Sequence, residues 1–540
     1  RSSPGPRARR CSSHSCSPGM QSHRPLLLFA LALVCESAGS TQRRHHWPVA
    51  RGNWEHYSVS AHRAPAELVS KAPSWFWRHP KGRYSVIGPG GTLIDDRRCI
   101  YFANGDGIRK YDASGTLLWF YESYFSHVPS LDGDEIYGIT ADGFAFAVGL
   151  ESGAERWRTR VVADGNEDTR GLVREAEWSA VPKGMGSGIC TTGVYGGLLL
   201  GPTGQSTGPF MPGGSTHVTA VNVTDGAVAW HYHADNQLWN FQPHFTGNGT
   251  FVFQDQHGGV YHMTLAGKLL WKSGHTGIWA ETWTDGEVML HDQVVYAAHS
   301  EDYWDKAATR TPQDGGDYSA YRLSDGELLW RWASPLIPNS QPVIVKSPLG
   351  SGLSVVMPIG SPMNPPGALQ LAMKLSQRYP AARRLFEFSG LLSTFLFTVP
   401  VHLLGMILGD RQQWLFGNAP WPTSVVGLDA ATGALQWQWS PPDWLRATNA
   451  GDEEGFFPRM GGICSPNPWS SPSQDASGTI YLGHLSGEFY ALRDANGDGL
   501  IDATEVSSYR TGSAFSNPGP ALGPGLLAVA DCDTLYVWSE

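Results

Sequence analysis

The chain has 540 residues and a net charge of −10, and only 16% of its residues are charged. Its 64 glycines, 37 prolines and 22 tryptophans predict many short strands and tight turns rather than long helices. The negative net charge argues against a general nucleic-acid-binding role, so we expect no nucleic acid partner.

The N-terminal region reads as a leader followed by a secretory signal. Residues 1–19 are basic and precede Met20, which we expect to be the true start, so we interpret them as an untranslated leader. Residues 20–40 combine a short basic region, an apolar core and a small-residue exit, which indicates a signal peptide. The alternative is an apolar patch in a disordered tail. Residues 41–73 are polar and basic and predict a linker, and the protein is expected to be secreted or in the endomembrane lumen.

A short phrase then recurs six times, and residues 321–330 are its clearest copy: a strand, a tight turn, and a strand ending in tryptophan. In every copy a glycine stands four positions before the tryptophan; these glycines are Gly115, Gly153, Gly226, Gly267, Gly326 and Gly433. Glycine suits the turn because it adopts positive φ at little cost. The tryptophan is expected to pack into the neighbouring copy, since an indole buries a large apolar area. Self-similarity at roughly 40 residues, with four strands per unit, predicts an all-β fold, the β-propeller.

This phrase resembles the pyrroloquinoline-quinone (PQQ)-type repeat, written as a strand followed by Asp-x-x-x-Gly-x-x-x-Trp. The repeat is found in quinoprotein alcohol dehydrogenases and in an outer-membrane assembly lipoprotein of bacteria. The resemblance covers roughly Ser74 to Glu540. It implies the fold more strongly than any chemistry, because function depends on sites carried by a fold.

The strand pattern predicts eight four-stranded antiparallel blades over residues 74–540, with seven blades as the alternative. Residues 74–78 read as the outer strand of a blade, yet nothing before them supplies inner strands. Residues 518–540 supply inner strands with no outer strand after them. We therefore expect the N-terminal strand to complete the last blade and close the propeller without a free sheet edge.

We name the strands of each blade A to D from centre to rim, so that A–B and C–D turns share one face and B–C loops share the other. Three B–C loops are long, at about 201–216, 299–317 and 361–421. We expect this long-loop face to bind a protein or glycan ligand, drift in loop length being the alternative.

The third long loop predicts a helical insertion in blade six. Its uncharged stretch from Phe388 to Leu408 follows an amphipathic basic segment, which indicates contact with a membrane surface or an apolar partner. A helix folded on the propeller and a true membrane span are the alternatives. A single span would leave the last blades across the membrane from the first five, so the propeller would not close.

One segment carries definite chemistry, because residues 494–505 match the twelve-residue calcium loop of EF-hand proteins. The expected ligands are the side chains of Asp494, Asn496, Asp498, Asp502 and Glu505 and the backbone carbonyl of Leu500. The loop stands where a C–D turn is expected and lacks flanking helices, so we interpret it as a structural calcium site. A solvated acidic turn is the alternative.

Four cysteines follow the predicted signal: Cys99, Cys190, Cys464 and Cys532. Their even number predicts two disulfides, with a weak preference for Cys190–Cys464 and free buried thiols as the alternative. Two sequons, at Asn222 and Asn248, are consistent with a glycoprotein.

No catalytic residue is assigned, because no zinc-protease helix or phosphate loop occurs. The resemblance implies a quinone and a calcium ion in the central channel, often beside two adjacent cysteines. This sequence has no adjacent cysteines, and its calcium loop is expected at the rim. We therefore expect a monomeric, calcium-stabilised binding scaffold that does not use PQQ. The alternative is a quinoprotein-like oxidoreductase that uses PQQ and calcium.

Overall fold

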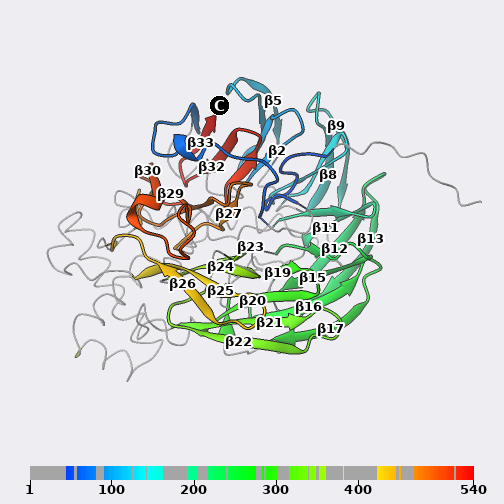
Figure 1. The fold of residues 1–540 in the computed structure, drawn as a ribbon. Helices are drawn as coiled ribbons and strands as arrows, with labels where there is room; N and C mark the ends of the chain where they lie inside the picture. Colours follow the sequence, from blue (N-terminus) through cyan, green and yellow to red (C-terminus); the bar gives the residue numbers. More distant parts are fainter. Residues whose placement is uncertain are drawn as a thin grey trace, which may run out of the picture. The chain divides into compact units, whose positions relative to one another are not determined.

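Eight separate sheets make up the chain in a computed structural model (Figure 1). It describes residues 44–540 except 54–57, 81–90, 124–126, 141–142, 162–190, 204–216, 237, 239–240, 275–281, 285–287, 302–314, 339, 348–351, 361–380, 382–421, 445–448, 452–467 and 516–517. All described residues belong to one compact unit.

The first four blades follow one another along the chain. Their strands are β2 (Thr92–Ile94), β3 (Ile100–Asn104), β4 (Gly107–Tyr111) and β5 (Leu117–Glu122); β6 (Ser130–Asp132), β7 (Glu135–Ile139), β8 (Phe144–Gly149) and β9 (Glu155–Arg160); β10 (Gly193–Tyr195), β11 (Leu198–Thr203), β12 (His217–Asn222) and β13 (Val228–His233); and β14 (His244–Phe245), β15 (Thr250–Gln254), β16 (Gly259–Thr264) and β17 (Leu269–Gly274).

The next three blades repeat the order, except that strand A of blade five is split into two short strands that both pair with β20. These strands are β18 (Thr282–Trp283), β19 (Met289–His291), β20 (Val294–Glu301), β21 (Gly316–Arg322) and β22 (Leu328–Ser334); β23 (Val343–Lys346), β24 (Leu353–Gly360), β25 (Thr423–Asp429) and β26 (Leu435–Trp439); and β27 (Ser473–Gln474), β28 (Ile480–Gly483), β29 (Glu488–Leu492) and β30 (Val506–Arg510).

The eighth blade joins the two ends of the described chain. Its inner strands are β31 (Ala521–Gly523), β32 (Leu526–Ala530) and β33 (Thr534–Ser539), and its outer strand is β1 (Trp75–Arg78). Strand β1 pairs antiparallel with β33, so that Phe76 lies opposite Tyr536. This confirms the predicted closure and the count of eight four-stranded antiparallel blades.

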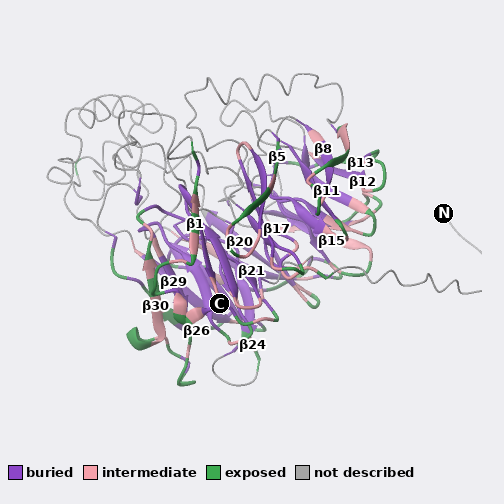
Figure 2. Cartoon of the chain, turned by 90° about the horizontal axis from the view of Figure 1, so that it is seen from above, coloured by how far each residue is buried: buried purple, intermediate pink, exposed green. Residues whose placement is uncertain are grey.

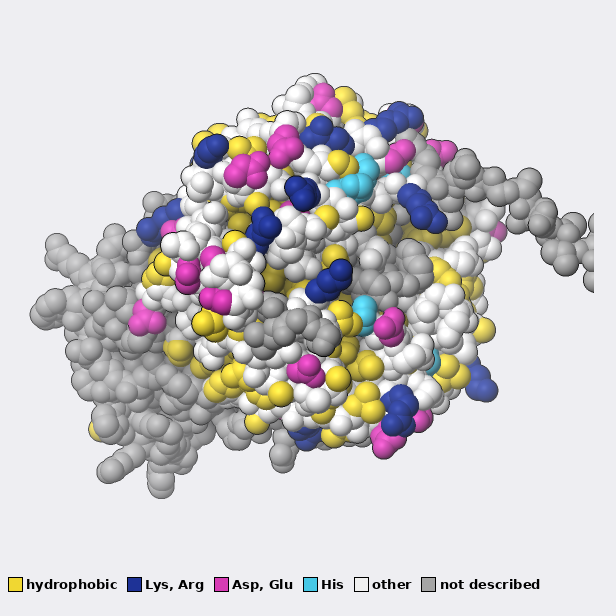
Figure 3. Space-filling view, viewed as in Figure 1, with side chains coloured by type: hydrophobic (Ala, Val, Ile, Leu, Met, Phe, Trp, Pro, Cys, Tyr) yellow, Lys and Arg dark blue, Asp and Glu magenta, His cyan; other side chains and the backbone are white. Residues whose placement is uncertain are grey.

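The core lies between the blades rather than at one centre. Inner strands such as β3 and β7 are buried along their whole length, because a neighbouring blade covers each of their faces. In Figure 2, most of the drawn strands, β20 and β21 among them, are buried. Outer strands such as β5 and β22 are half exposed. Apolar residues therefore remain visible between the interspersed acidic and basic side chains of the surface (Figure 3).

Tryptophans of the outer strands tie each blade to the next. The indole of Trp119 in blade one lies on Gly153 in blade two and donates from Nε1 to the carbonyl of Leu150, 3.0 Å away. The same arrangement joins five further pairs of blades, through Trp75, Trp157, Trp230, Trp271 and Trp330. Each turn glycine thus adopts the positive φ of its own turn and also leaves space for the tryptophan of the previous blade.

Helix is scarce in the described residues. Two short 3₁₀ helices are present, η1 (Ala66–Leu68) and η3 (Ala503–Glu505). The predicted helical insertion at 361–421 lies outside the described residues apart from Ala381. The stretch from Phe388 to Leu408 lies outside them too, and among the described residues no helix has the length and apolar character needed to cross a bilayer.

The expectation of two disulfides is wrong at Cys99, which is a free, buried thiol. It packs among apolar residues of blades one and two, and burial raises the pKa of the thiol to about 11. Cys190 and Cys464, the preferred pair, lie outside the described residues. At most one disulfide can therefore form among Cys190, Cys464 and Cys532.

Candidate functional site

The predicted calcium loop, residues 494–505, connects β29 to β30 in blade seven, at the position of a C–D turn. Its first and last acidic residues organise it. The carboxylate of Asp494 accepts hydrogen bonds from the backbone N–H groups of Gly497 and Gly499, at 2.6 and 2.9 Å. Glu505 Oε1 accepts from the N–H groups of Ala495 and Asn496, at 2.8 and 3.1 Å. The carboxylates at both ends of the loop thus accept backbone N–H groups from the first half of the loop.

The remaining predicted ligands line the same loop. Asn496 Nδ2 donates to the carboxylate of Asp498 at 3.1 Å, and Asp502 begins η3 with a capping box that includes Glu505. The hydrogen bond from the Thr504 hydroxyl lowers the pKa of Asp502, so this carboxylate stays ionised. Leu500 is 59% exposed.

The donor set is made of hard oxygens in an exposed loop, which suits a calcium-sized cation. Among the described residues, however, no three His, Cys, Asp or Glu side chains converge closely enough to hold a metal ion as they stand. A cation would therefore have to draw the carboxylates of Asp494, Asp498 and Glu505 together, in exchange for some of the hydrogen bonds that they now accept from the backbone.

The loop also changes how blades six and seven meet. Trp437 corresponds to the tryptophans that lie on the next blade's turn glycine, but the loop replaces that turn. Instead the indole nitrogen lies on Gly427 of its own blade, where an added Cβ would be 2.1 Å away. Trp437 is 5% exposed, and its Nε1 has no hydrogen-bond partner among the described residues. Ile501 of the loop packs into the apolar cluster that contains this indole.

A second feature is the N-terminal segment, residues 44–74, which the sequence predicts as a linker up to residue 73. Trp47 is fully buried and pairs with Ile94 at the end of strand A in blade one, through two hydrogen bonds of 2.8 and 3.0 Å. The carbonyl of Pro48 accepts from Leu131 in blade two. The chain then turns at Gly52 and returns, so that Val59 pairs with Gln474 in blade seven.

This segment reaches across the inner ends of several blades. Arg51 is 3% exposed, and its charge acts on the buried hydroxyl of Tyr318 in blade five. Further along, the carbonyl of Arg63 accepts from the N–H of Gly525 in blade eight, and the carbonyl of Lys71 accepts from the indole of Trp538. The segment therefore covers the A–B turns of blades one, two, seven and eight.

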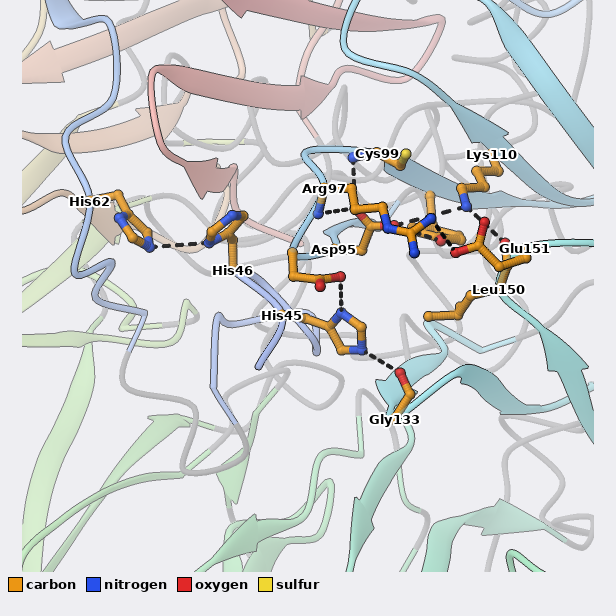
Figure 4. Close-up of polar contacts among 12 residues, drawn as sticks. His45, His46, His62, Asp95, Arg97, Cys99, Lys110, Gly133, Leu150 and Glu151 are labelled. Atoms are coloured by element: carbon orange, nitrogen blue, oxygen red, sulfur yellow. Dashed lines mark hydrogen bonds and ion pairs between the residues drawn. The ribbon is translucent and has the colours of Figure 1, made fainter. Parts of the chain in front are cut away.

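Histidines anchor the start of this segment (Figure 4). His45 has a buried side chain whose Nε2 lies 2.9 Å from the carbonyl of Gly133 and whose Nδ1 lies 3.6 Å from Asp96. His46 Nδ1 lies 3.1 Å from His62 Nε2, so a hydrogen bond between these two side chains joins residues 46 and 62 of the N-terminal segment. Burial and the neighbouring His62 lower the pKa of His46, which favours the neutral form of this imidazole.

Sequence reasoning missed one group of buried carboxylates. Asp95, Asp255 and Asp475 each follow a strand, accept two backbone N–H groups of the following turn, and accept the hydroxyl of a tyrosine six residues later (Tyr101, Tyr261 and Tyr481). The recurrence of Asp and Tyr six positions apart was the available signal. Because these oxygens are occupied within their own turns, we interpret the carboxylates as structural.

Most of each long B–C loop, at 201–216, 299–317 and 361–421, lies outside the described residues. Two buried polar residues that precede inner strands, Gln341 and Gln242, are neutral amides. Gln341 precedes strand A of blade six and reaches the carbonyl of Val288 in blade five and Nε2 of His244 in blade four, at 2.6 and 3.0 Å. Gln242 is 2% exposed, and neither of its side-chain polar atoms has a partner among the described residues.

Comparison with protein families supports the fold. Residues 104–274 match the PQQ-repeat family model described as outer membrane protein assembly factor BamB. A search among curated proteins found no match.

Similar solved structures cover most of the chain at low identity. BamB from Moraxella catarrhalis shares 13% identity over 87% of this chain and 99% of its own, with a TM-score of 0.50. A europium-containing methanol dehydrogenase shares 11% identity over 90% and 89%, with a TM-score of 0.52. The quinohemoprotein alcohol dehydrogenase from Comamonas testosteroni shares 11% over 91% and 80%, with a TM-score of 0.54. Identities this low speak for the fold alone. With the eight sheets and their closure, they show that this protein is an eight-bladed β-propeller, of which residues 104–274 resemble PQQ-type repeats.

Proposed function

We propose that this propeller is a binding scaffold of the secreted or endomembrane-lumen space, stabilised by calcium and working as a monomer. Its ligand would be a protein or a glycan. The observation that carries this proposal is the N-terminal segment, whose residues around Trp47 and Arg51 are buried at the inner ends of the blades. The A–B turns of blades one, two, seven and eight are thus packed against the protein's own N-terminal segment.

The rival proposal is a quinoprotein-like oxidoreductase. PQQ is a flat tricarboxylate, so a site for it needs cationic partners. Gln242 and Gln341, which precede inner strands, are neutral, and the buried Arg51 belongs to the N-terminal segment. These residues do not fit the cofactor, which supports the scaffold.

Reconstitution separates the two proposals. Purified protein is incubated with PQQ and calcium and assayed for dye-linked oxidation of alcohols and sugars. The scaffold predicts no turnover above protein-free cofactor, together with saturable binding of a purified ligand recovered on the immobilised protein. Turnover that scales with protein concentration would overturn the scaffold and support the oxidoreductase.

For calcium, the residues that would hold the ion are Asp494, Asn496, Asp498, Asp502 and Glu505, with the carbonyl of Leu500. A bound cation would neutralise the acidic loop and fasten β29 to β30, which gives it a structural and not a catalytic role. Calorimetric titration of the wild type against Glu505→Gln tests the assignment. The matched control is Asp225→Asn, because Asp225 is an exposed carboxylate in a C–D turn that accepts one backbone N–H, from Ala227. Equal affinities in the wild type and Glu505→Gln would refute the ligand assignment.

Membrane contact through the stretch from Phe388 to Leu408 stays part of the proposal. Deleting this stretch should abolish flotation with anionic liposomes while the propeller still melts cooperatively. Unchanged flotation would remove the membrane from the proposal.

Secretion of a chain that starts at Met20, compared with that of a chain that starts at residue 41, tests the predicted signal.

A further inference from the structure

Two predicted sequons lie on one face of neighbouring blades and differ in geometry. Asn248 stands in the A–B turn of blade four, and Asn222 ends strand β12 at the C–D turn of blade three. We propose that Asn248, and not Asn222, is the acceptor of an N-linked glycan. This inference rests on the secretory route of the proposed function.

The carboxamide of Asn248 is held by its oxygen in the folded protein. Thr250 Oγ1 donates to Asn248 Oδ1 at 2.9 Å. Thr246 donates to the same oxygen. Every hydrogen bond that the structure gives this carboxamide involves Oδ1, and the residue is exposed, so a substituent on Nδ2 displaces none of these bonds. Nε2 of His262 lies 2.8 Å from Thr250 Oγ1 and holds the hydroxyl in place.

The surroundings of Asn248 leave room for a sugar. Its neighbours Gly247 and Gly249 have no side chains, and both have positive φ, at 80° and 87°. A Cβ added at Gly249 would have no heavy atom within 4 Å. The turn therefore presents an exposed Asn248 between two glycines. Blade three contacts the turn beside it, where the hydroxyl of Tyr195 donates to the carbonyl of Gly247 at 2.8 Å.

Asn222 is placed differently. Its Oδ1 accepts the backbone N–H of Thr224 at 2.9 Å, so the side chain holds its own turn and not the sequon hydroxyl. The residue is half-buried. Next to it, the carbonyl of Val223 accepts the indole N–H of Trp157 from blade two at 2.9 Å, and Gly226 of the same turn lies on that indole. A glycan here would crowd the junction of blades two and three.

The reaction is a transfer from a lipid-linked oligosaccharyl pyrophosphate. Nδ2 attacks the anomeric carbon, a C–N bond forms, the C–O bond to the pyrophosphate breaks, and the lipid pyrophosphate leaves. Nδ2 loses one proton to base, and no electrons are exchanged with an oxidant or reductant. The transfer acts on the unfolded chain, so the folded propeller has to accommodate the product, which the exposed tip at Asn248 does.

A glycan at this position also restricts the binding surface. The A–B turn of blade four would be shielded, and the same face carries the calcium loop and the N-terminal segment. A partner of the scaffold would then approach the opposite face or the rim.

The experiment expresses the full chain in eukaryotic cells behind a heterologous secretory signal, so that entry into the pathway does not depend on residues 20–40. The secreted protein is treated with peptide-N-glycosidase and compared by intact mass. We expect one glycan in the wild type and in Asn222→Gln, and none in Asn248→Gln or Thr250→Val. Thr250→Ser, which keeps both the hydroxyl and the sequon, should restore it.

Two results would overturn the assignment: a glycan that persists in Asn248→Gln, or a secreted wild type whose mass the enzyme does not change. Because Thr250→Val and Asn248→Gln remove the acceptor by different routes, misfolding of one variant leaves the other to decide. Failure of the natural signal to direct secretion, with Asn248 glycosylated behind the heterologous one, would count against the proposed location and not against this site.

Discussion

The indole of Trp330 in blade five lies on Gly433 of blade six and donates from Nε1 to the carbonyl of Ala430, 3.0 Å away. Each partner constrains the other. The glycine has φ +72°, and an added Cβ would lie 2.5 Å from Cε3 of the indole. The turn and the junction between blades therefore depend on the same missing side chain.

Gly433→Ala should destabilise the protein more than an ordinary strained turn does. A left-handed non-glycine residue costs about 1–3 kcal/mol by itself, and here the methyl group also displaces the indole. The matched control is Gly478→Ala, because Gly478 has φ +86° and open space around its Cβ position. Urea unfolding of the two variants measures the difference, and equal losses would show that the contact with Trp330 contributes nothing.

Trp330→Phe and Trp437→Phe should change the free energy of unfolding by different amounts. The first loses a buried hydrogen bond, which typically costs about 0.5–1.5 kcal/mol, besides the lost packing area. The second also loses packing area, but it loses no hydrogen bond and removes a buried donor that has no partner among the described residues, so it should cost less than the first. Chemical denaturation of both variants checks this. A larger loss for Trp437→Phe would contradict the role given to its unpartnered Nε1.

Acid should destabilise the propeller through His484. This imidazole is buried in blade seven, 3.0 Å from the hydroxyl of Thr423 in blade six, and burial lowers its pKa to about 3. The unfolded chain takes up a proton near pH 6.5 while the folded state does not, so stability falls as pH drops below about 6.5 and continues to fall toward pH 3.

His484→Gln should therefore lose stability at about pH 7 but show a smaller further loss between about pH 7 and pH 5. The residual slope belongs to other buried groups, among them His127, whose pKa burial lowers to about 4. Replacing the exposed His233 by Gln is the control and should leave the slope unchanged. An identical slope in wild type and His484→Gln would contradict this account.

Chelation of calcium should lower the melting temperature if the loop at 494–505 fastens blade seven. A ligand that binds only the folded state stabilises it by RT ln(1 + [L]/Kd), about 2.7 kcal/mol at a hundredfold excess over Kd. Melting is measured in calcium and in chelator for the wild type and for Glu505→Gln. The variant should show a much smaller shift than the wild type; equal shifts would place the calcium elsewhere in the protein.

Local spacing was enough to predict the architecture. Gly326 and Trp330 stand four positions apart, as do five other such pairs, and an incomplete first blade with an incomplete last one implied the pairing of β1 with β33. These features can be predicted from the sequence because turn chemistry and strand alternation act over a few residues. The ligands of the calcium loop could be proposed from the sequence for the same reason, since one short segment supplies all six predicted donors.

Only the tertiary structure decided what depends on residues far apart in the chain. Cys99 is a free thiol buried among apolar residues of blades one and two, which the count of cysteines did not predict. Trp47 and Arg51 belong to a polar, basic stretch that looks like a linker, yet they are buried because four blades bring their A–B turns together around them. Composition reports the average character of a segment, whereas burial depends on which surfaces the closed propeller places beside it.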